Sequence, residues 1–467
     1  MISKHQITSF VFCMLVLTAC GFPRPPDLAQ CNLSSDCTSA IAPICIHGTC
    51  VASCQVNDHC QGIAGKPFCD MSSGQCVACL DGTNCPTDKP TCDATARVCR
   101  GCLTDDECSS GVCLEAESRC ANEAEVLFVA VSANSTDVGT CSRASPCATL
   151  PYAISLATTS RNIIAITGGQ ISTPSTISID RPVYIHGNGT IIHRGGVVVS
   201  TPQFTAVTLE ELTVTAESGN PLVAVTVGSS GSLRLYHATV TGQITTNGGT
   251  ISVAKSTFVT PDTFNADGIV CTSGTVAVTQ SSFHRVVVRC SNCQVAVDKS
   301  TFDMLSDGSI SVQGGVARIE NNLIMNAIDL ADSMVVIGVA PGSTIRFNTF
   351  VNTSGVASDG TALGCDGTPI VTSNIFAYNS MHPFTPTDTC PSRYSLFDST
   401  AVSAETQGSG NQVADAALFF VDRARKDFHL SSTSPARGKA EPGLGVGDDI
   451  EGHQRPATAD IGAYQSQ

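Results

Sequence analysis

Three charged residues occupy the same position in successive copies of a repeated phrase in the second half of the chain. Asp298, Glu320 and Arg346 each stand four residues before a bulky apolar residue. Arg318 falls on the same face as Glu320, because side chains alternate along a strand. Such a group can bind a cation or a uronate sugar. It can also be a surface ion network that relieves the repulsion between Asp298 and Glu320, and we favour this second interpretation because exposed ion pairs are common and nearly neutral in energy.

No other pattern in the sequence indicates a reaction. The chain contains no G-x-S-x-G nucleophile turn, no H-E-x-x-H motif and no EF-hand loop. The glycine-rich loop at 443–447 has neither a preceding strand nor a following helix, so it does not indicate a dinucleotide site. The absence of Trp and the presence of only 6 Tyr weaken both a glycanase and a lectin interpretation. We therefore expect no catalytic residue to be assignable, no metal site and no cofactor.

The repeated phrase itself predicts the fold. It alternates apolar and polar residues and ends on an apolar anchor five residues after its first residue. The anchors are Val214, Val240, Phe258, Phe283, Phe302, Ile324, Phe350 and Phe376. Their mean spacing of about 23 residues is typical of one turn of a β-solenoid with three short strands. A two-sheet sandwich would need hairpin turns, and Asn-Gly or Asp-Gly pairs do not recur here at regular intervals.

Polar residues recur two positions before the anchors. These residues are Ser256, Ser281, Ser300, Asn322, Asn348 and Asn374. In a coil whose turns stack about 4.8 Å apart, they are expected to form one hydrogen-bonded ladder at a corner.

A different repeat precedes the solenoid. Sixteen cysteines between Cys31 and Cys120 form four units that begin at residues 31, 54, 79 and 102. Each unit is too small to bury a core, so we expect two disulfides per unit, with three connectivities left open. The rival interpretation is zinc, because Cys76-x-x-Cys79 and Cys99-x-x-Cys102 have zinc-knuckle spacing. We favour disulfides, since those pairs straddle unit boundaries.

Seven further cysteines lie in the solenoid region, and an odd number leaves one without a partner. Cys271 and Cys290 each stand twelve residues before an anchor, which predicts that they stack on successive turns about 5 Å apart. We therefore predict the disulfides Cys141–Cys147, Cys271–Cys290 and Cys365–Cys390, with Cys293 free. The competing pair is Cys290–Cys293.

The N-terminus predicts export and lipid attachment. Lys4 and the apolar run Ile7 to Leu17 are followed by Leu17-Thr18-Ala19-Cys20, which resembles a bacterial lipobox. The resemblance implies that Cys20 becomes the lipidated first residue. We divide the chain into a signal peptide at 1–19, a lipidated tether at 20–30, disulfide-rich repeats at 31–120 and the β-helix with its caps at 121–467.

Two family resemblances extend this division. The cysteine units resemble the disulfide-rich repeats of myxobacterial surface lipoproteins. Residues 126 to 467 resemble right-handed parallel β-helix proteins of the pectate-lyase-like superfamily. Their end resembles the choice-of-anchor Q family, through Phe428-His429-Leu430, Ser434-Pro435-Ala436, Asp449, Arg455-Pro456 and Asp460-Ile461-Gly462-Ala463-Tyr464. The expected fold class is thus an all-β right-handed parallel β-helix preceded by small disulfide-rich repeats.

Composition narrows the function. The net charge of −15 argues against nucleic acid as a partner, and 25 cysteines in 467 residues indicate an exported protein. We predict a non-catalytic lipoprotein of the bacterial outer membrane or cell surface, with a lipid anchor, whose β-helix serves adhesion or binds a carbohydrate or a surface protein. The alternatives are a membrane-anchored polysaccharide lyase or glycosidase, for which alone Ca²⁺ is expected, and a structural spacer of the envelope.

Overall fold

The computed structural model describes residues 31–466 with internal gaps, and the chain divides into two compact units, 1–122 and 123–467. The undescribed residues are 1–30, 32, 39–43, 47–48, 87–88, 131–135, 168, 174, 190, 196–198, 202–204, 219–221, 261–265, 305–308, 327–334, 353–361, 378–390, 400–407, 445–446 and 467. No helix among the described residues is long and apolar enough to cross a membrane.

The first unit consists of repeated hairpins that are held by disulfides. Its antiparallel pairs are β1 (Ile44–Ile46) with β2 (Thr49–Val51), β3 (Phe68–Asp70) with β4 (Gln75–Val77), β5 (Thr91–Cys92) with β6 (Cys99–Arg100), and β7 (Cys113–Leu114) with β8 (Arg119–Cys120). Short 3₁₀ turns accompany them: η1 (Ser34–Asp36), η2 (Asn57–Cys60), η3 (Gly82–Asn84), η4 (Asp105–Glu107) and η5 (Glu115–Glu117). The four repeats of the sequence are therefore four copies of one small structure.

All sixteen repeat cysteines are disulfide-bonded, which excludes the zinc interpretation for them. In every unit the first cysteine bonds the third and the second bonds the fourth. The pairs are Cys31–Cys45, Cys37–Cys50, Cys54–Cys69, Cys60–Cys76, Cys79–Cys92, Cys85–Cys99, Cys102–Cys113 and Cys108–Cys120. The third and fourth cysteines face each other across each hairpin, for example Cys69 opposite Cys76. One hairpin thus carries one end of both bridges, which replaces the core that so short a unit cannot bury.

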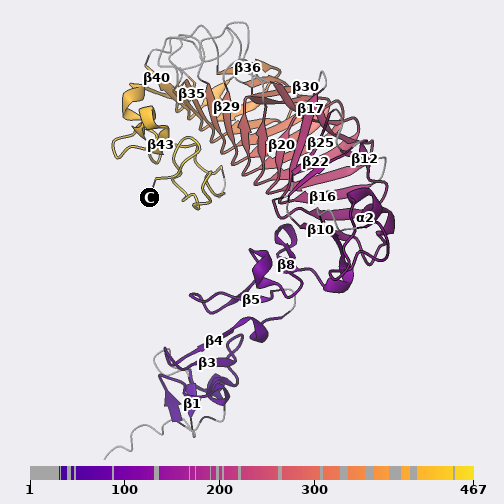
Figure 1. Cartoon of the computed structure of the whole chain (residues 1–467). Coiled ribbons are helices and arrows are strands. Elements are labelled where there is room, and N and C mark those ends of the chain that lie inside the picture. Colours follow the sequence, from indigo (N-terminus) through magenta and orange to yellow (C-terminus); the bar gives the residue numbers. More distant parts are fainter. Residues whose placement is uncertain are drawn as a thin grey trace, which may run out of the picture. The chain divides into compact units, whose positions relative to one another are not determined.

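The second unit is a parallel β-helix built from three sheets (Figure 1). Sheet 1 contains β9 (Val126–Ala130), β10 (Ile163–Thr167), β13 (Val183–His186), β16 (Ala206–Glu210), β19 (Ser232–Tyr236), β22 (Gly249–Ala254), β25 (Gly274–Thr279), β28 (Cys293–Asp298), β31 (Val316–Glu320), β34 (Thr344–Arg346), β37 (Ile370–Thr372) and β39 (Ser392–Arg393). Sheet 2 contains β11 (Gln170–Ser172), β14 (Ile191–Gly195), β17 (Thr213–Ser218), β20 (Thr239–Thr241), β23 (Thr257–Val259), β26 (Ser282–His284), β29 (Thr301–Met304), β32 (Leu323–Asn326), β35 (Thr349–Asn352), β38 (Ile375–Ala377), β40 (Leu396–Asp398) and β41 (Gln412–Ala414). Sheet 3 contains β12 (Ile177–Ser178), β15 (Val199–Thr201), β18 (Val223–Val227), β21 (Gln243–Thr246), β24 (Ala266–Cys271), β27 (Val286–Ser291), β30 (Ile310–Gln313), β33 (Val335–Gly338) and β36 (Leu363–Asp366).

The predicted anchors form one column inside sheet 2. Each anchor pairs in parallel register with the next, from Val214 opposite Val240 to Phe350 opposite Phe376. Stacked rings follow one another at 4.7–5.0 Å between centroids. Parallel pairing between successive turns rules out the sandwich alternative, and the repeat period of the sequence is the turn of the helix.

The corner between sheets 1 and 2 carries the predicted polar ladder. The side-chain oxygen of Asn348 accepts a hydrogen bond from the backbone N–H of Asn322 at 3.0 Å, and that of Asn374 accepts from Asn348 at 2.9 Å. The same bond recurs from Ser256 onwards and continues through Ser395 and Asn411, which the sequence pattern did not reveal. The ladder thus satisfies backbone donors that the sharp corner takes out of the sheets.

The residue just before each ladder position has left-handed backbone geometry. The φ angles are 49° at Lys255, 50° at Lys299, 55° at Asn321 and 58° at Ser373. A single left-handed residue turns the chain sharply without a glycine, and its side chain then leaves the corner into solvent or towards a neighbouring segment. This geometry determines where Lys299 and Asn321 point.

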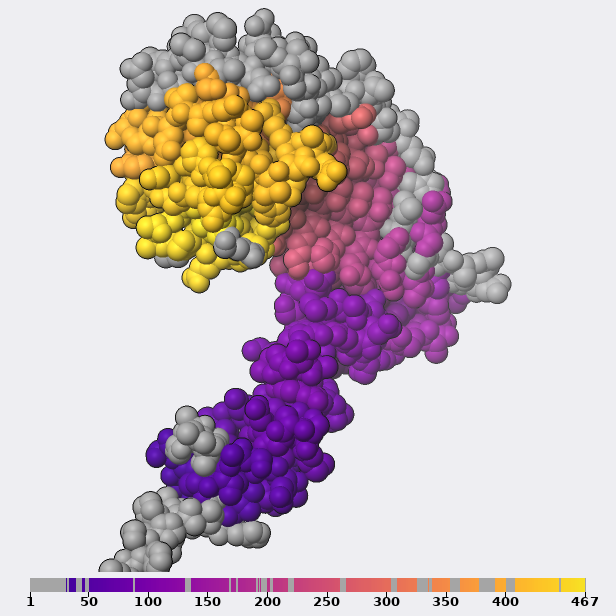
Figure 2. All heavy atoms as spheres, turned by 90° about the vertical axis from the view of Figure 1, so that its left-hand side faces the viewer, coloured from indigo at the N-terminus to yellow at the C-terminus, as the bar shows by residue number. Residues whose placement is uncertain are grey.

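The two ends of the β-helix are closed by short elements. At the N-terminal end lie η6 (Glu123–Glu125) and α2 (Leu150–Leu156), whose first turn is capped by the Thr149 hydroxyl. At the other end, η8 (Ala416–Leu418), β42 (Phe420–Asp422), η9 (Arg423–Arg425) and β43 (Asp427–Leu430) begin a segment that continues to residue 466 and forms its own lobe, yellow in Figure 2. This C-terminal segment (residues 416–466) packs Phe419, Phe428 and Ile461 against sheet 2 residues such as Leu323 and Ile375, and together they form a second apolar core.

One predicted disulfide is wrong, although the register behind it is right. Cys271 and Cys290 are direct neighbours on β24 and β27, but Cys271 is bonded to Cys293, with the Cα atoms 6.5 Å apart, and Cys290 is a buried free thiol. Stacked residues of parallel strands point the same way, so their Cβ atoms keep the strand spacing of about 4.8 Å, wider than the roughly 3.8 Å typical of a disulfide. Cys293 begins β28 in sheet 1, whereas Cys271 ends β24 in sheet 3. The two side chains therefore approach each other from different sheets.

The other two predicted pairs have different outcomes. Cys141 and Cys147 are joined by a disulfide. Cys365 is disulfide-bonded, and its predicted partner, Cys390, lies outside the described residues.

The thiol of Cys290 is expected to resist alkylation in the folded protein. Burial raises its pKa to about 12, and the reactive species is the thiolate. Among the described cysteines, iodoacetamide should label none in the native protein and Cys290 alone after denaturation without reductant, as measured by peptide mass spectrometry. A peptide that joins Cys271 to Cys290 would contradict this assignment.

Candidate functional site

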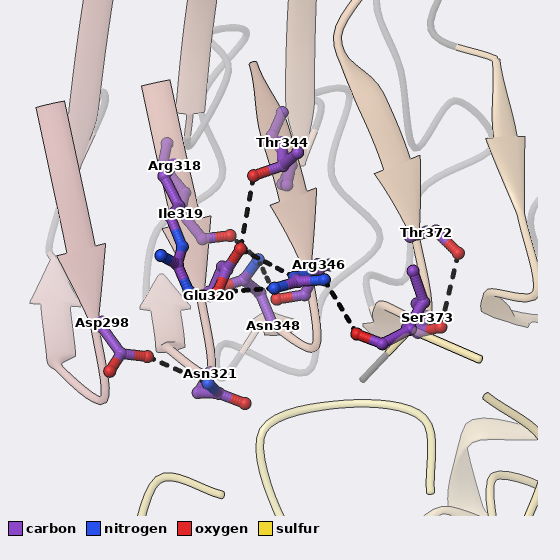
Figure 3. A network of polar contacts seen from close by, with 12 residues as sticks. Asp298, Arg318, Ile319, Glu320, Asn321, Thr344, Arg346, Asn348, Thr372 and Ser373 are labelled. Atoms are coloured by element: carbon purple, nitrogen blue, oxygen red, sulfur yellow. Dashed lines mark hydrogen bonds and ion pairs between the residues drawn. The ribbon is translucent and has the colours of Figure 1, made fainter. Parts of the chain in front are cut away.

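The four charged residues of the sequence analysis lie together on sheet 1. Asp298, Glu320 and Arg346 end the adjacent strands β28, β31 and β34, and each is the register partner of the next. Arg318 lies two residues before Glu320 on the same outer face of β31. Equal position in the repeat therefore becomes contact in space, because the turns stack in register (Figure 3).

Glu320 is the centre of the cluster. Its Oε2 lies 2.8 Å from the Arg318 Nη2, and its Oε1 lies 2.7 Å from the Arg346 Nε. The Thr344 hydroxyl also donates to Oε1, at 3.3 Å. Asp298 contacts neither arginine within ion-pair distance and instead accepts a hydrogen bond from the Asn321 amide at 2.9 Å. The ion network thus forms around one carboxylate rather than two.

Glu320 at the centre of the cluster is buried, not exposed as its sequence pattern implied, whereas Arg318 remains exposed. Glu320 is only 3% exposed, whereas the Arg318 side chain is 65% exposed. The C-terminal segment covers the site: Arg346 Nη1 donates to the Leu444 carbonyl at 3.2 Å, and Lys299 Nζ lies 3.3 Å from Asp448 Oδ2. The covered space is a polar cavity of about 380 Å³. An expectation from strand alternation alone could not include a segment more than a hundred residues away.

Arg455 links the C-terminal segment to residues of the β-helix next to the cluster. It is 2% exposed, and its guanidinium lies 4.3 Å from the centre of the Phe347 ring. Its Nη2 donates to Asn321 Oδ1 at 3.0 Å and to the Gly462 carbonyl at 2.8 Å. Its Nε has no hydrogen-bond partner among the described residues. Burial lowers the pKa of Arg455 to about 10, so that it stays charged at neutral pH.

Sequence reasoning did not connect four charged or amide residues of this cavity with the site. They are Lys299, Asn321, Asp448 and Arg455. For Arg455 a signal existed, because it lies in the terminal motif, but the motif indicated a closing role rather than a position under sheet 1. For Lys299 and Asn321 the signal was their place just before the ladder residues, where the chain turns the corner.

The electrostatics of Glu320 oppose a role in acid–base catalysis. Burial disfavours the charged form, but the hydrogen bonds and charges of Arg318 and Arg346 outweigh burial and lower the pKa of Glu320 below its ordinary value. A general acid for sugar chemistry needs a raised pKa and a second carboxylate free to act. Here the carboxylate is held ionised and is fully engaged.

The same lowered pKa makes the stability of this unit depend on pH. A carboxyl whose folded pKa lies below its unfolded value stabilises the fold above about pH 4.5 and loses this contribution as pH falls through the folded pKa. Comparing Glu320→Gln with the parent chain in urea unfolding, we expect a lower free energy of unfolding for the variant at pH 7 and a smaller difference at pH 3. A difference that stays constant with pH would contradict the ion-pair assignment.

A second group of residues lies on the outer face of the same sheet. Tyr236 and Arg234 point outward from β19, Lys255 Nζ lies 4.9 Å from the centre of the Tyr236 ring, and the Arg234 guanidinium lies 5.9 Å from it. In the column between Arg234 and Arg318 the outward positions hold the small side chains Ser252, Ala277 and Ala296, and in the neighbouring column Tyr236 is followed by Ala254, Thr279 and the carboxylate Asp298. The outer face of sheet 1 thus carries short side chains between Arg234 at one end and Arg318 at the other.

Comparison with known proteins concerns the fold. No family model matches the chain, and no curated protein matches it. Among solved structures it is similar to the crystal structure of pectate lyase Pel9A, with 13% identity and a TM-score of 0.40 over 73% of this chain and 96% of that chain. A likeness with a TM-score this low carries no argument, and the parallel register of the strands is the direct evidence for the fold. The chain is an all-β protein with a parallel β-helix and disulfide-rich N-terminal repeats.

Proposed function

We propose that this protein is an exported, lipid-anchored surface protein whose β-helix binds an acidic polysaccharide without cleaving it. The observation that carries the proposal is the outer face of sheet 1 from β19 to β31. Arg234 and Arg318 occupy one outward column in register, four strands apart. At about 4.8 Å per strand the two guanidinium-bearing positions are about 19 Å apart, which matches a short run of sugar residues.

The chemistry of this face suits a uronate chain. Arginine side chains bind carboxylates with paired hydrogen bonds, and the face of Tyr236 offers an apolar platform for a sugar ring. The small side chains between them let an extended chain approach the sheet closely. Since the whole protein carries a charge of −15, binding depends on these local cations and is expected to weaken with added salt.

The state of the carboxylates supports binding rather than cleavage. Glu320 is buried between two arginines, and Lys299 pairs with Asp448. A lyase needs carboxylates free to hold Ca²⁺, and a glycosidase needs a protonated acid. In this cluster Glu320 and Asp448 are paired with basic side chains and only Asp298 has no ion-pair partner among the described residues, so the enzyme alternative has less support.

Export is supported by the covalent structure. Ten disulfides join described cysteines, and such a number persists only in an oxidising compartment. The lipobox and Cys20 lie outside the described residues, so the anchor rests on the sequence resemblance alone.

Titration of the full-length protein in detergent with polygalacturonate and alginate tests the binding proposal. We expect the parent protein to bind at least one of the two polysaccharides. The Tyr236→Ala and Arg318→Gln variants should each bind it at least tenfold more weakly than the parent protein. Arg289→Gln is the matched control, because Arg289 is an exposed arginine on sheet 3 that pairs with Asp267. Binding that is unchanged in both variants would refute the site. Release of unsaturated or reducing ends would favour the enzyme alternative.

Loss of the lipid anchor is expected to move the protein out of the membrane. Two or more acyl chains hold a protein stably on a bilayer, and none remain without the thiol of Cys20. Cys20→Ala should therefore shift the protein from the membrane fraction to an unprocessed or soluble form, as followed by fractionation and electrophoretic mobility. Unchanged membrane attachment would refute lipidation.

A further inference from the structure

Two histidines and two carboxylates meet within the C-terminal segment, away from the face of sheet 1. His429 lies on β43, and its Nδ1 is 2.6 Å from Asp427 Oδ1. Its Nε2 is 3.1 Å from each carboxylate oxygen of Glu451. One imidazole is thus placed between two carboxylates that come from different parts of the segment.

In one neutral tautomer of His429, the Nε2 lone pair faces Glu451. A neutral imidazole carries one N–H, and the short contact assigns it to Nδ1, which donates to Asp427. The other nitrogen then presents a lone pair to Glu451, which is itself only an acceptor. Two acceptors 3.1 Å apart need a proton or a metal ion between them. A carboxylate on the far ring nitrogen is the arrangement that orients metal-binding histidines.

A second imidazole lies near the same carboxylate. His453 Nδ1 lies 3.5 Å from Glu451 Oε2 and 3.4 Å from Asp449 Oδ2. Metal–ligand bonds of about 2.0–2.1 Å hold the ligand atoms of a tetrahedral zinc site about 3.3–3.4 Å apart. The separations of 3.1 and 3.5 Å around Glu451 bracket that value.

The loop that carries Glu451 and His453 is already held in shape. Asp449 is fully buried, and its Oδ1 accepts hydrogen bonds from the backbone N–H of Glu451 at 2.9 Å and of His453 at 2.8 Å. Its Oδ2 accepts from the backbone N–H of Gln465 at 2.9 Å. Because the backbone is fixed before any ion arrives, little ordering cost would oppose binding.

We propose that His429 Nε2, the Glu451 carboxylate and His453 Nδ1 bind one divalent transition-metal ion of the zinc class, with Asp427 orienting His429. Two imidazole nitrogens among three ligands favour zinc, copper or nickel over Ca²⁺ and Mg²⁺, which prefer oxygen. The side chains of His429, His453 and Glu451 are 40–49% exposed, so the ion reaches them from solvent and water completes its shell. The ion joins β43 to the loop at 449–453 and strengthens the closure of the β-helix, independently of the proposed glycan binding.

The test uses Zn²⁺ alone on the full-length protein in detergent, oxidised and stripped of metal with EDTA. Isothermal titration is expected to show one Zn²⁺ per chain, with no comparable binding of Ca²⁺ or Mg²⁺. Asp427→Asn should weaken binding about 10–100-fold, the usual effect of losing an orienting partner. Glu451→Gln should abolish it, and His284→Gln, which changes an exposed histidine on β26, should leave it unchanged.

X-ray absorption of the one-to-one complex keeps the proposal testable even if a variant fails to fold. We expect scattering from nitrogen and oxygen at about 2.0–2.1 Å that includes two imidazoles. A sulfur shell at about 2.3 Å would move the metal to cysteines and overturn the proposal. Absence of Zn²⁺ binding, binding that survives Glu451→Gln, or a preference for Ca²⁺ would overturn it equally.

Discussion

Arg455→Ala is expected to release the C-terminal segment from sheet 1. The substitution leaves three carbonyls, those of Asp460, Gly462 and Ala463, without the guanidinium that donates to them. Breaking buried interactions of a charged group costs about 3–5 kcal/mol, because the partners lose their hydrogen bonds and find no water. The cavity over Glu320 should open at the same time, since Arg455 also holds Asn321.

Urea unfolding of the β-helix and limited proteolysis measure this effect. We expect the free energy of unfolding to fall by about 3–5 kcal/mol and new cleavage sites to appear between residues 440 and 466. Arg437→Ala is the matched control, because Arg437 belongs to the same segment and takes part in none of these contacts. Equal resistance to proteolysis in the two variants would contradict the role assigned to Arg455.

Asn348→Leu is expected to be the most damaging change within the ladder. Asn348 is fully buried, accepts from the Asn322 N–H, and donates to the Ile319 carbonyl at 2.8 Å and to Asn374 Oδ1 at 3.0 Å. Leucine has a similar size but satisfies none of these groups. At about 1–3 kcal/mol for each of the three buried groups left without a partner, we expect a total loss of about 3–9 kcal/mol.

A graded comparison along the ladder tests the cause. Ser256 stands at its beginning and has a shorter side chain with two hydrogen bonds, so Ser256→Ala should cost about 1 kcal/mol. Both variants are compared by urea unfolding followed by circular dichroism, which reports strand content. Equal losses for Asn348→Leu and Ser256→Ala would indicate that side-chain volume rather than hydrogen bonding determines stability at this corner.

Much of the β-helix could be predicted from the sequence because its interactions repeat. Phe283 and Phe302 contact each other at the same position of adjacent turns, so a constant offset from the anchor was enough to bring them together. The same logic placed Asp298 beside Glu320 and Asn348 beside Asn374. The spacing of the turns varies, but insertions fall in the connections and leave the register unchanged.

The disulfide at Cys271 marks the limit of that logic. Register identified Cys290 as its neighbour, but a bond depends on the direction of the side chains as well as on their spacing. Cys293 lies three residues after Cys290, in a different sheet, and its side chain points towards Cys271, whereas the side chain of Cys290 points in the same direction as that of Cys271. The distance in sequence from an anchor residue does not show in which direction a side chain points.

By itself, the sequence determined the period of the coil, its inner column, its polar corner and the two-bridge structure of each cysteine unit, because all of these are contacts between neighbouring repeats. Only the tertiary structure decided what covers sheet 1. The C-terminal segment does not repeat, so no offset relates Leu444, Asp448 or Arg455 to the strands they contact. Its contacts with Arg346 and Lys299 cover the side of the cluster where Glu320 is buried, whereas the pKa of that carboxyl is lowered by Arg318 and Arg346, which belong to sheet 1 itself. The fold of the C-terminal segment also brings the Nε2 of His429 and the carboxylate of Glu451, 22 residues apart in the chain, to 3.1 Å.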